Sequence, residues 1–164
     1  MAWTAPRTWT TGELVTAAFM NNHVRDNLLF LVSRTSADLN ADVNGFTNTS
    51  YADLDALTTA AFASPVAVTL TTGTAALVII SAARIQQVTS GTVFMSYRVS
   101  GASTIASDDD RSIRYSDTSV ATMTYQIPVT TLTAGSNTFE LQARTTANSA
   151  NLSNPVITVI PTAT

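Results

Sequence analysis

Alternating hydrophobic and polar positions run through most of the chain after Pro65, and they predict a series of β-strands. Residues 75–82 (AALVIISA) differ, because they form a continuous apolar run rich in β-branched side chains. Such a run is typical of a central strand that is covered on both faces. Strands are expected at 66–70, 75–82, 92–99, 111–115, 120–129, 138–145 and 155–161.

Turn residues separate these runs, and no helical pattern lies between them. Gly73, Gly91 and Gly135 mark turns, and Pro128 is expected at an edge or a bend because it lacks a backbone N–H. About seven or eight short strands in this arrangement predict a mainly β protein, an antiparallel β-sandwich of jelly-roll type.

One helix is expected ahead of the strands, within residues 9–31. Thr16 is a plausible N-cap, and the apolar side chains behind it recur at helical spacing. A helix of about four turns is marginal alone and must bury its stripe against another surface. That surface is either a bundle of sister chains, with Asn21 setting the register, or the protein's own sheet. The stripe consists of Met20, Val24, Leu28 and Leu31.

An extended arm is expected before the helix. Trp3 and Trp9 within this arm either pack on the protein's own helix or lodge on a neighbouring subunit. Residues 41–50 (ADVNGFTNTS) have the composition of a connector. The predicted division is therefore an arm and helix for anchoring and oligomerisation at 1–45, and a β-sandwich domain at 51–164, with irregular structure at 51–62.

Composition narrows the classes of function. The chain has 164 residues, 45% of them hydrophobic, so a core can form. Only 12% are charged, the net charge is −3 and every cation is an arginine, so nucleic-acid binding is not expected. No cysteine is present, which removes disulfides and thiolate chemistry. The longest apolar run, 75–80, is too short to insert into a membrane.

The candidate chemistry is sparse. Asp108, Asp109 and Asp110 form the one acidic cluster, a weak candidate metal site and more simply a solvated loop that pairs with Arg111. His23 has no second histidine to share a metal, and no nucleophile elbow or phosphate-binding loop occurs. We therefore expect no enzyme activity and no cofactor.

Exposed aromatic residues beside carboxylates suggest a different role, the binding of glycans. Tyr97 and Tyr115, with Tyr125 and the acidic cluster nearby in sequence, are the candidate glycan contacts. Core packing of these tyrosines is the alternative.

Residues 9–28 (WTTGELVTAAFMNNHVRDNL) resemble the N-terminal segment of many small structural proteins of tailed bacteriophages. Residues 132–144 (LTAGSNTFELQAR) and 157–161 (ITVIP) are also similar to such proteins. The resemblance implies a virion component with an N-terminal anchoring region and a β-sandwich head, commonly a trimer.

Together, these observations predict a non-enzymatic phage structural protein, an appendage on the tail or the head. We expect a homotrimer with Val24, Leu28 and Leu31 facing the threefold axis, in contact with other virion proteins. It would assemble in the host cytoplasm and be exposed on the extracellular particle. The alternatives are a capsid decoration (cement) protein that bridges capsomers and a receptor-recognition module that binds a host surface glycan.

Overall fold

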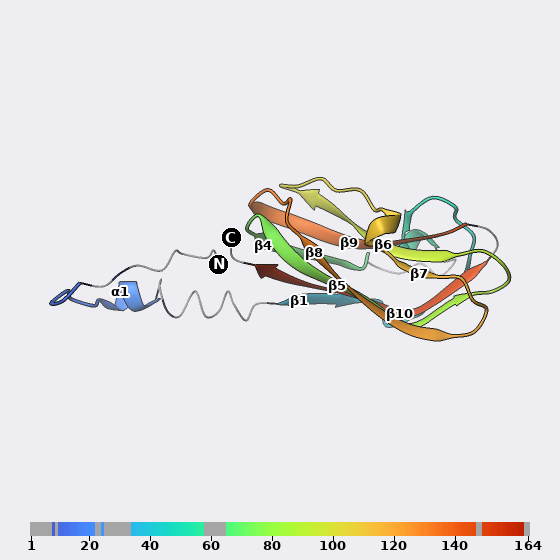
Figure 1. The fold of residues 1–164 in the computed structure, drawn as a ribbon, viewed down its shortest axis with the longest axis horizontal. Coiled ribbons are helices and arrows are strands. Elements are labelled where there is room, and N and C mark those ends of the chain that lie inside the picture. Colours follow the sequence, from blue (N-terminus) through green and yellow to red (C-terminus); the bar gives the residue numbers. More distant parts are fainter. Residues whose placement is uncertain are drawn as a thin grey trace.

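Two antiparallel sheets packed face to face make up the body of the molecule, and a short helix lies beyond one end of them (Figure 1). The computed structural model describes residues 8, 10–21, 24, 34–57, 65–146 and 149–162. In chain order the elements are α1 (Ala17–Met20), β1 (Thr35–Asp38), β2 (Asp42–Phe46), β3 (Ala52–Asp53), the 3₁₀ helix η2 (Leu54–Leu57), β4 (Ala67–Thr72), β5 (Ala75–Gln87), β6 (Val93–Gly101), the 3₁₀ helix η3 (Asp109–Arg111), β7 (Ile113–Tyr115), β8 (Ala121–Val129), β9 (Gly135–Thr145) and β10 (Ala150–Thr162).

The order of the strands is that of a jelly roll. One sheet runs β1-β10-β5-β8, with β2 also on β10, and the other runs β3-β9-β6-β7, with β4 also on β9. β6 pairs with β7, the strand that follows it in the chain. Moving outward along the sequence from this pair, β5 pairs with β8, β4 with β9 and β1 with β10. Every pairing is antiparallel. The predicted fold class, a mainly β sandwich, is confirmed.

The core lies between the sheets and is filled by alternate side chains of the long strands. On β5, Val78 and Ile80 are fully buried, whereas Leu77 and Ile79 on the opposite face are only half-buried. The prediction of a central strand is correct, because β5 lies between β10 and β8, but the prediction that both of its faces are covered is wrong. From the other sheet, Tyr97, Phe139 and Leu141 enter the core with no exposed surface.

The segment predicted as a connector, 41–50, contains strand β2. Val43 and Phe46 are buried although they stand three residues apart, which breaks the alternation that reveals a strand. Opposite them, Leu152 and Ala150 of β10 stand two apart, so β2 carries a bulge. Gly45 sits in this bulge at φ +71° and donates its N–H to Asn151 Oδ1 at 2.8 Å. The extra residue turns both apolar side chains inward, and the connector prediction is therefore wrong.

Strand β1 extends the same sheet further toward the N-terminus. Thr35 to Asp38 pair with Val159 to Val156 of β10. The sheet thus begins at residue 35, ahead of the predicted start of the sandwich at 51. In the region predicted to be irregular, η2 buries Leu54 and Leu57.

Candidate functional site

The helix predicted after Thr16 begins where the sequence indicates. The Thr16 hydroxyl accepts a hydrogen bond from the Phe19 N–H at 3.3 Å, and α1 follows as Ala17–Met20. Asn21 keeps a helical conformation at the end of α1, and its N–H is bonded to the carbonyls of Ala17 and Ala18. The N-cap prediction is therefore confirmed.

A tight turn precedes the helix and gives a physical reason for the Thr-Thr-Gly-Glu sequence. The Glu13 N–H bonds to the Thr10 carbonyl at 3.1 Å, and Gly12 takes φ +83° at the third position of the turn. The Glu13 carboxylate accepts from the Thr10 N–H at 3.3 Å and from its hydroxyl at 3.4 Å. The turn fixes the direction in which the chain enters the helix.

Apolar side chains of this N-terminal segment face solvent. None of the residues of α1 is buried, and Figure 1 places the helix away from both sheets. The exposed fractions are 79% for Leu14, 49% for Val15, 45% for Met20 and 41% for Val24. The described part of the segment thus carries apolar side chains that its own chain covers only in part.

Several residues of the predicted anchoring set lie outside the described residues: Trp3, Trp9, Leu28 and Leu31, together with His23. Their predicted roles stay predictions.

The acidic cluster of residues 108–110 forms the start of η3, and each of its side chains has a different partner. Asp108 Oδ1 accepts from the Asp110 N–H at 2.8 Å, as an N-cap does. Asp109 pairs with Arg144, and Asp110 lies 3.1 Å from Arg114. The predicted pairing with Arg111 does not occur among the described residues; the cluster pairs with Arg144 and Arg114 instead.

Asp109 is the centre of an ion pair that holds the loop before β7 against the outer face of the second sheet. Its carboxylate accepts from Arg144 Nε at 3.0 Å and from the Tyr51 hydroxyl at 2.9 Å. The Arg144 bond keeps the pKa of Asp109 below its ordinary value. Burial, reinforced by the bond to Asp109, raises the pKa of Tyr51 to about 12, so this phenol remains a donor at neutral pH.

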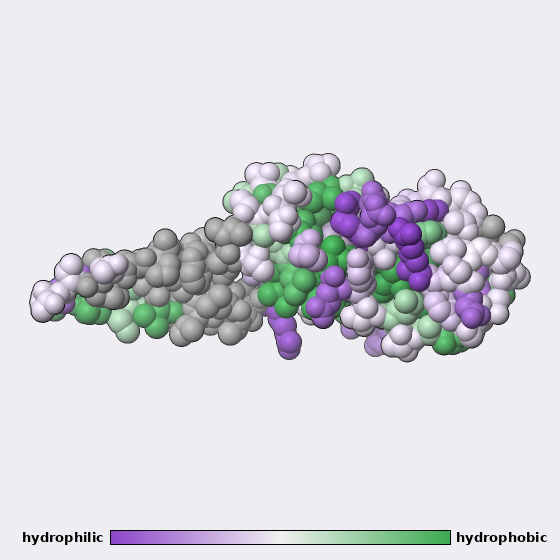
Figure 2. Space-filling view, viewed as in Figure 1, coloured by the Kyte–Doolittle hydropathy of each residue, from purple (hydrophilic) through white to green (hydrophobic). Residues whose placement is uncertain are grey.

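Aromatic rings complete this arrangement. The Arg144 guanidinium lies 4.1 Å from the Phe94 ring centroid and 5.5 Å from that of Tyr51. Arg114 lies 5.7 Å from the Phe94 centroid. In Figure 2 hydrophilic atoms gather beside β6 and β7, and hydrophobic atoms lie next to them over the middle of the sandwich. These contacts explain why Phe94, on an outward-facing position, is nonetheless buried at 7% exposure.

A second polar cluster lies on the same sheet face. Arg98 donates to Glu140 at 2.7 and 2.9 Å and to Asp53 at 3.1 Å. Asp53 also accepts from the Gln142 amide at 2.7 Å. Glu140, whose side chain is 11% exposed, is thereby neutralised by Arg98. This arrangement ties β3, β6 and β9 together through their side chains.

The tyrosines considered as glycan contacts differ in how far they are buried. Tyr97 has no exposed surface, so its ring cannot contact a glycan, and that assignment is wrong. The reason is the register of β6, which turns Tyr97 inward against Phe139, with ring centroids 6.3 Å apart. Tyr115 is partly buried against the core, and its hydroxyl lies 2.9 Å from Ser119 Oγ. Tyr125 on β8 is 41% exposed.

Within the described ranges, no three His, Cys, Asp or Glu side chains come together as potential metal ligands. Among the helices of the same residues, none is long and apolar enough to span a bilayer.

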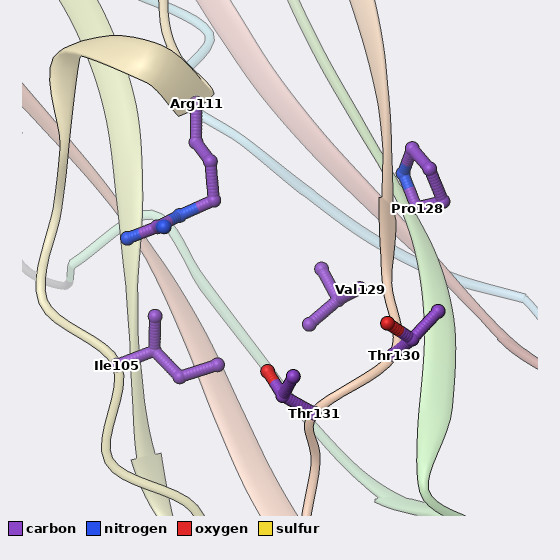
Figure 3. A pocket seen from close by; sticks show the side chains of 6 residues that line it. All are labelled: Ile105, Arg111, Pro128, Val129, Thr130 and Thr131. Carbon is purple, nitrogen blue, oxygen red and sulfur yellow. The ribbon is translucent and has the colours of Figure 1, made fainter.

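A pocket that the sequence does not indicate opens between η3, the preceding loop and the end of β8 (Figure 3). Its volume is about 200 Å³. In Figure 3 the side chains of Ile105 and Val129 point toward each other across it, and Arg111 descends from η3 at one end. The lining residues are Ile105, Arg111, Pro128, Val129, Thr130 and Thr131. Residues 128–131 lie at and just beyond the end of a strand of one sheet, and residues 105–111 lie between two strands of the other, so the packing of the two sheets brings them together.

Comparisons with known proteins add little to this picture. No protein-family model matches the chain, and no curated protein matches it. A solved structure of infectious bursal disease virus, Gx strain, is similar to this chain with 11% sequence identity and a TM-score of 0.44. The match covers 78% of this chain and 33% of that chain, so the present chain spans about a third of the length of its neighbour. The jelly-roll assignment accordingly rests on the order and direction of the chain's own strands.

Proposed function

We propose that the protein is a non-enzymatic structural component of a tailed-bacteriophage virion. The N-terminal arm and helix attach the chain, and the jelly-roll domain projects from the attachment. The observation that carries this proposal is the exposure of Leu14, Val15, Met20 and Val24 on a segment that lies away from the sandwich.

Most apolar side chains in the strands of the sandwich are buried, whereas Leu14, Val15, Met20 and Val24 are each more than 40% exposed. Covering three or four such side chains contributes roughly 1.5–3 kcal/mol each. Ordering some fifteen residues opposes this by about 1–2 kcal/mol per residue. Burial of these side chains alone therefore does not offset the cost of ordering the segment, so in the proposed homotrimer the sandwich domains would help to hold the sister chains together. Val24, Leu28 and Leu31 would face the threefold axis, and Asn21 would set the register.

The sequence of the segment supports a virion role. Its resemblance to N-terminal segments of phage structural proteins includes Gly12, Glu13 and Thr16, and these residues build the turn and the helix cap. The resemblance therefore includes residues that determine the local conformation of the segment. A glycan-binding role lacks such support, since Tyr97 is in the core.

Sedimentation of the full chain at micromolar concentration tests the assembly. We expect a trimer, and we expect Val24→Asp to weaken it, because a charge in an apolar interface loses its hydration. Val120→Asp is the matched control: Val120 is 59% exposed and lies on the sandwich. A monomeric wild-type chain, or equal effects of the two substitutions, would contradict the proposal.

The place on the particle needs a separate experiment. Antibodies against the sandwich should label purified particles, at the tail or head fibres for an appendage and across the capsomers for a decoration protein. Absence of the chain from purified particles would refute the virion role itself.

A further inference from the structure

The pocket between η3 and the end of β8 is lined by both apolar and polar side chains. Its walls come from three separate segments: Ile105 in the loop, Arg111 on η3, and residues 128–131 (Figure 3). The lining consists of apolar side chains, two threonines and one arginine. This combination of apolar walls and a few polar groups is usual in small-molecule sites.

Arg111 differs from its neighbours in its partners. Arg98, Arg114 and Arg144 each pair with a carboxylate. In the described part of the chain Arg111 has no carboxylate partner, and its guanidinium donates to the Ala106 carbonyl at 2.6 Å. Its Nε is buried and has no hydrogen-bond partner within the same residues. The positive charge beside the pocket is therefore not neutralised by the residues described.

A second buried donor lies near this charge. The Tyr97 hydroxyl is buried and makes no hydrogen bond to the described residues. Burial raises the pKa of Tyr97 to about 12, and the charge of Arg111 acts in the opposite direction. The phenol thus stays protonated at neutral pH. An unpaired buried donor is costly. Tyr97 is not one of the residues that line the pocket, so among the described residues the Arg111 Nε is the unpaired donor beside it.

The chemistry of the lining selects the ligand. A planar guanidinium matches a carboxylate through two parallel hydrogen bonds. The single positive charge of Arg111 matches a ligand with one negative charge. Ile105 and Val129 can contact the carbon atoms of that ligand. The volume of about 200 Å³ is below that of sites for drug-sized ligands, roughly 300 Å³ and above, and admits a small group.

We propose that the pocket bounded by Ile105, Arg111 and residues 128–131 binds a small organic carboxylate, with Arg111 as the charged anchor. Thr130 and Thr131 offer hydroxyls to the polar part of the ligand, and Ile105 and Val129 contact its carbon atoms. This site is independent of the proposed virion role, because every residue involved belongs to the sandwich.

Titration of the full chain with small ligands, followed by the NMR chemical shifts of its backbone amides, tests this proposal. The probes are butyrate and glucuronate, their neutral counterparts 1-butanol and glucose, and inorganic phosphate. We expect a carboxylate to shift the amides of Ile105, Val129, Thr130 and Thr131 saturably, and the neutral compounds to leave them in place. Saturable shifts with the neutral compounds, stronger binding of phosphate, or no shift with either carboxylate would overturn the proposal.

Substitution of Arg111 is the second test of the proposed site. Arg111→Gln should weaken carboxylate binding by at least about tenfold, the usual effect of a lost charged hydrogen bond. Arg34→Gln, on an exposed residue outside the pocket, should bind as the wild type does. If Arg111→Gln fails to fold, Arg111→Lys serves instead, and it should bind more weakly because the planar fork is lost. Binding by the folded Arg111 variant at wild-type strength would refute the assignment.

Discussion

At the scale of single residues, the partner of each charged side chain explains its role better than the cluster in which it stands in the sequence. Three consecutive aspartates read as one acidic run, yet they cap η3, pair with Arg144 and meet Arg114 separately. Of the ion pairs made by the three aspartates, that of Asp109 with Arg144 connects distant parts of the chain, and the side chain of Arg144 is only 18% exposed. The three aspartates therefore make three different contacts within and around the loop.

This difference between neighbouring aspartates is measurable. Asp109→Asn should lower the free energy of unfolding at neutral pH by about 1 kcal/mol, a charged hydrogen bond discounted for solvent screening. Asp110→Asn is the control, because the Asp110 side chain is 91% exposed and should contribute almost nothing.

The effect should depend on pH in a definite direction. The pKa of Asp109 in the folded chain lies below its ordinary value of 3.8, so its ionised form is stabilised by folding. This stability is fully present above the ordinary pKa and is lost as the pH falls through the lower folded-state value. Urea unfolding from neutral into acid pH should show the wild type and Asp109→Asn converging. A difference that stays constant into the acid range would contradict this.

At the scale of elements, the strands with clean alternation are predicted well and the irregular ones are missed. Residues 66–70, 92–99 and 120–129 match β4, β6 and β8 within a few residues, because one face of each strand enters the core. Pro128 lies on β8, an edge strand, as expected. β2 was missed because the bulge at Gly45 changes the spacing of its buried side chains.

A substitution in β2 tests whether this strand is part of the core. Phe46→Ala should lower the free energy of unfolding by about 3–5 kcal/mol, because Phe46 is 2% exposed and its loss leaves a cavity. Phe19→Ala, on α1 where no residue is buried, should leave the stability of the sandwich unchanged. Equal stability of the two variants in urea would contradict the strand assignment.

At the scale of the whole molecule, the first and last strands close the sandwich. β10 pairs with β1, β2 and β5, and residues 156–159 lie opposite β1. Contacts between positions so far apart in sequence form only when the entire chain has been arranged. The closing strand is therefore essential, whereas the residues described before 34 are not part of either sheet.

Two truncations test whether β10 is essential for the fold and the N-terminal segment is not. Removing residues 1–33 should leave a domain with cooperative thermal unfolding, since all the strands remain. Ending the chain at residue 154 should abolish that transition, because Ile80 and Val78 lose Ile157 and Val159 opposite them. Circular dichroism during heating checks both. A cooperative transition in the C-terminally truncated chain would show that β10 is dispensable.

The sequence by itself determined the class of fold, the start of the helix and the positions of most strands. These features depend on local periodicity and on capping, which neighbouring residues carry. Tertiary structure alone decided that residues 35–46 join the sheet, that Tyr97 faces the core, and that Arg111 meets residues 128–131. The first two depend on strand register and on a bulge, which are fixed only when strands distant in sequence pair. The third depends on the packing of one sheet against the other.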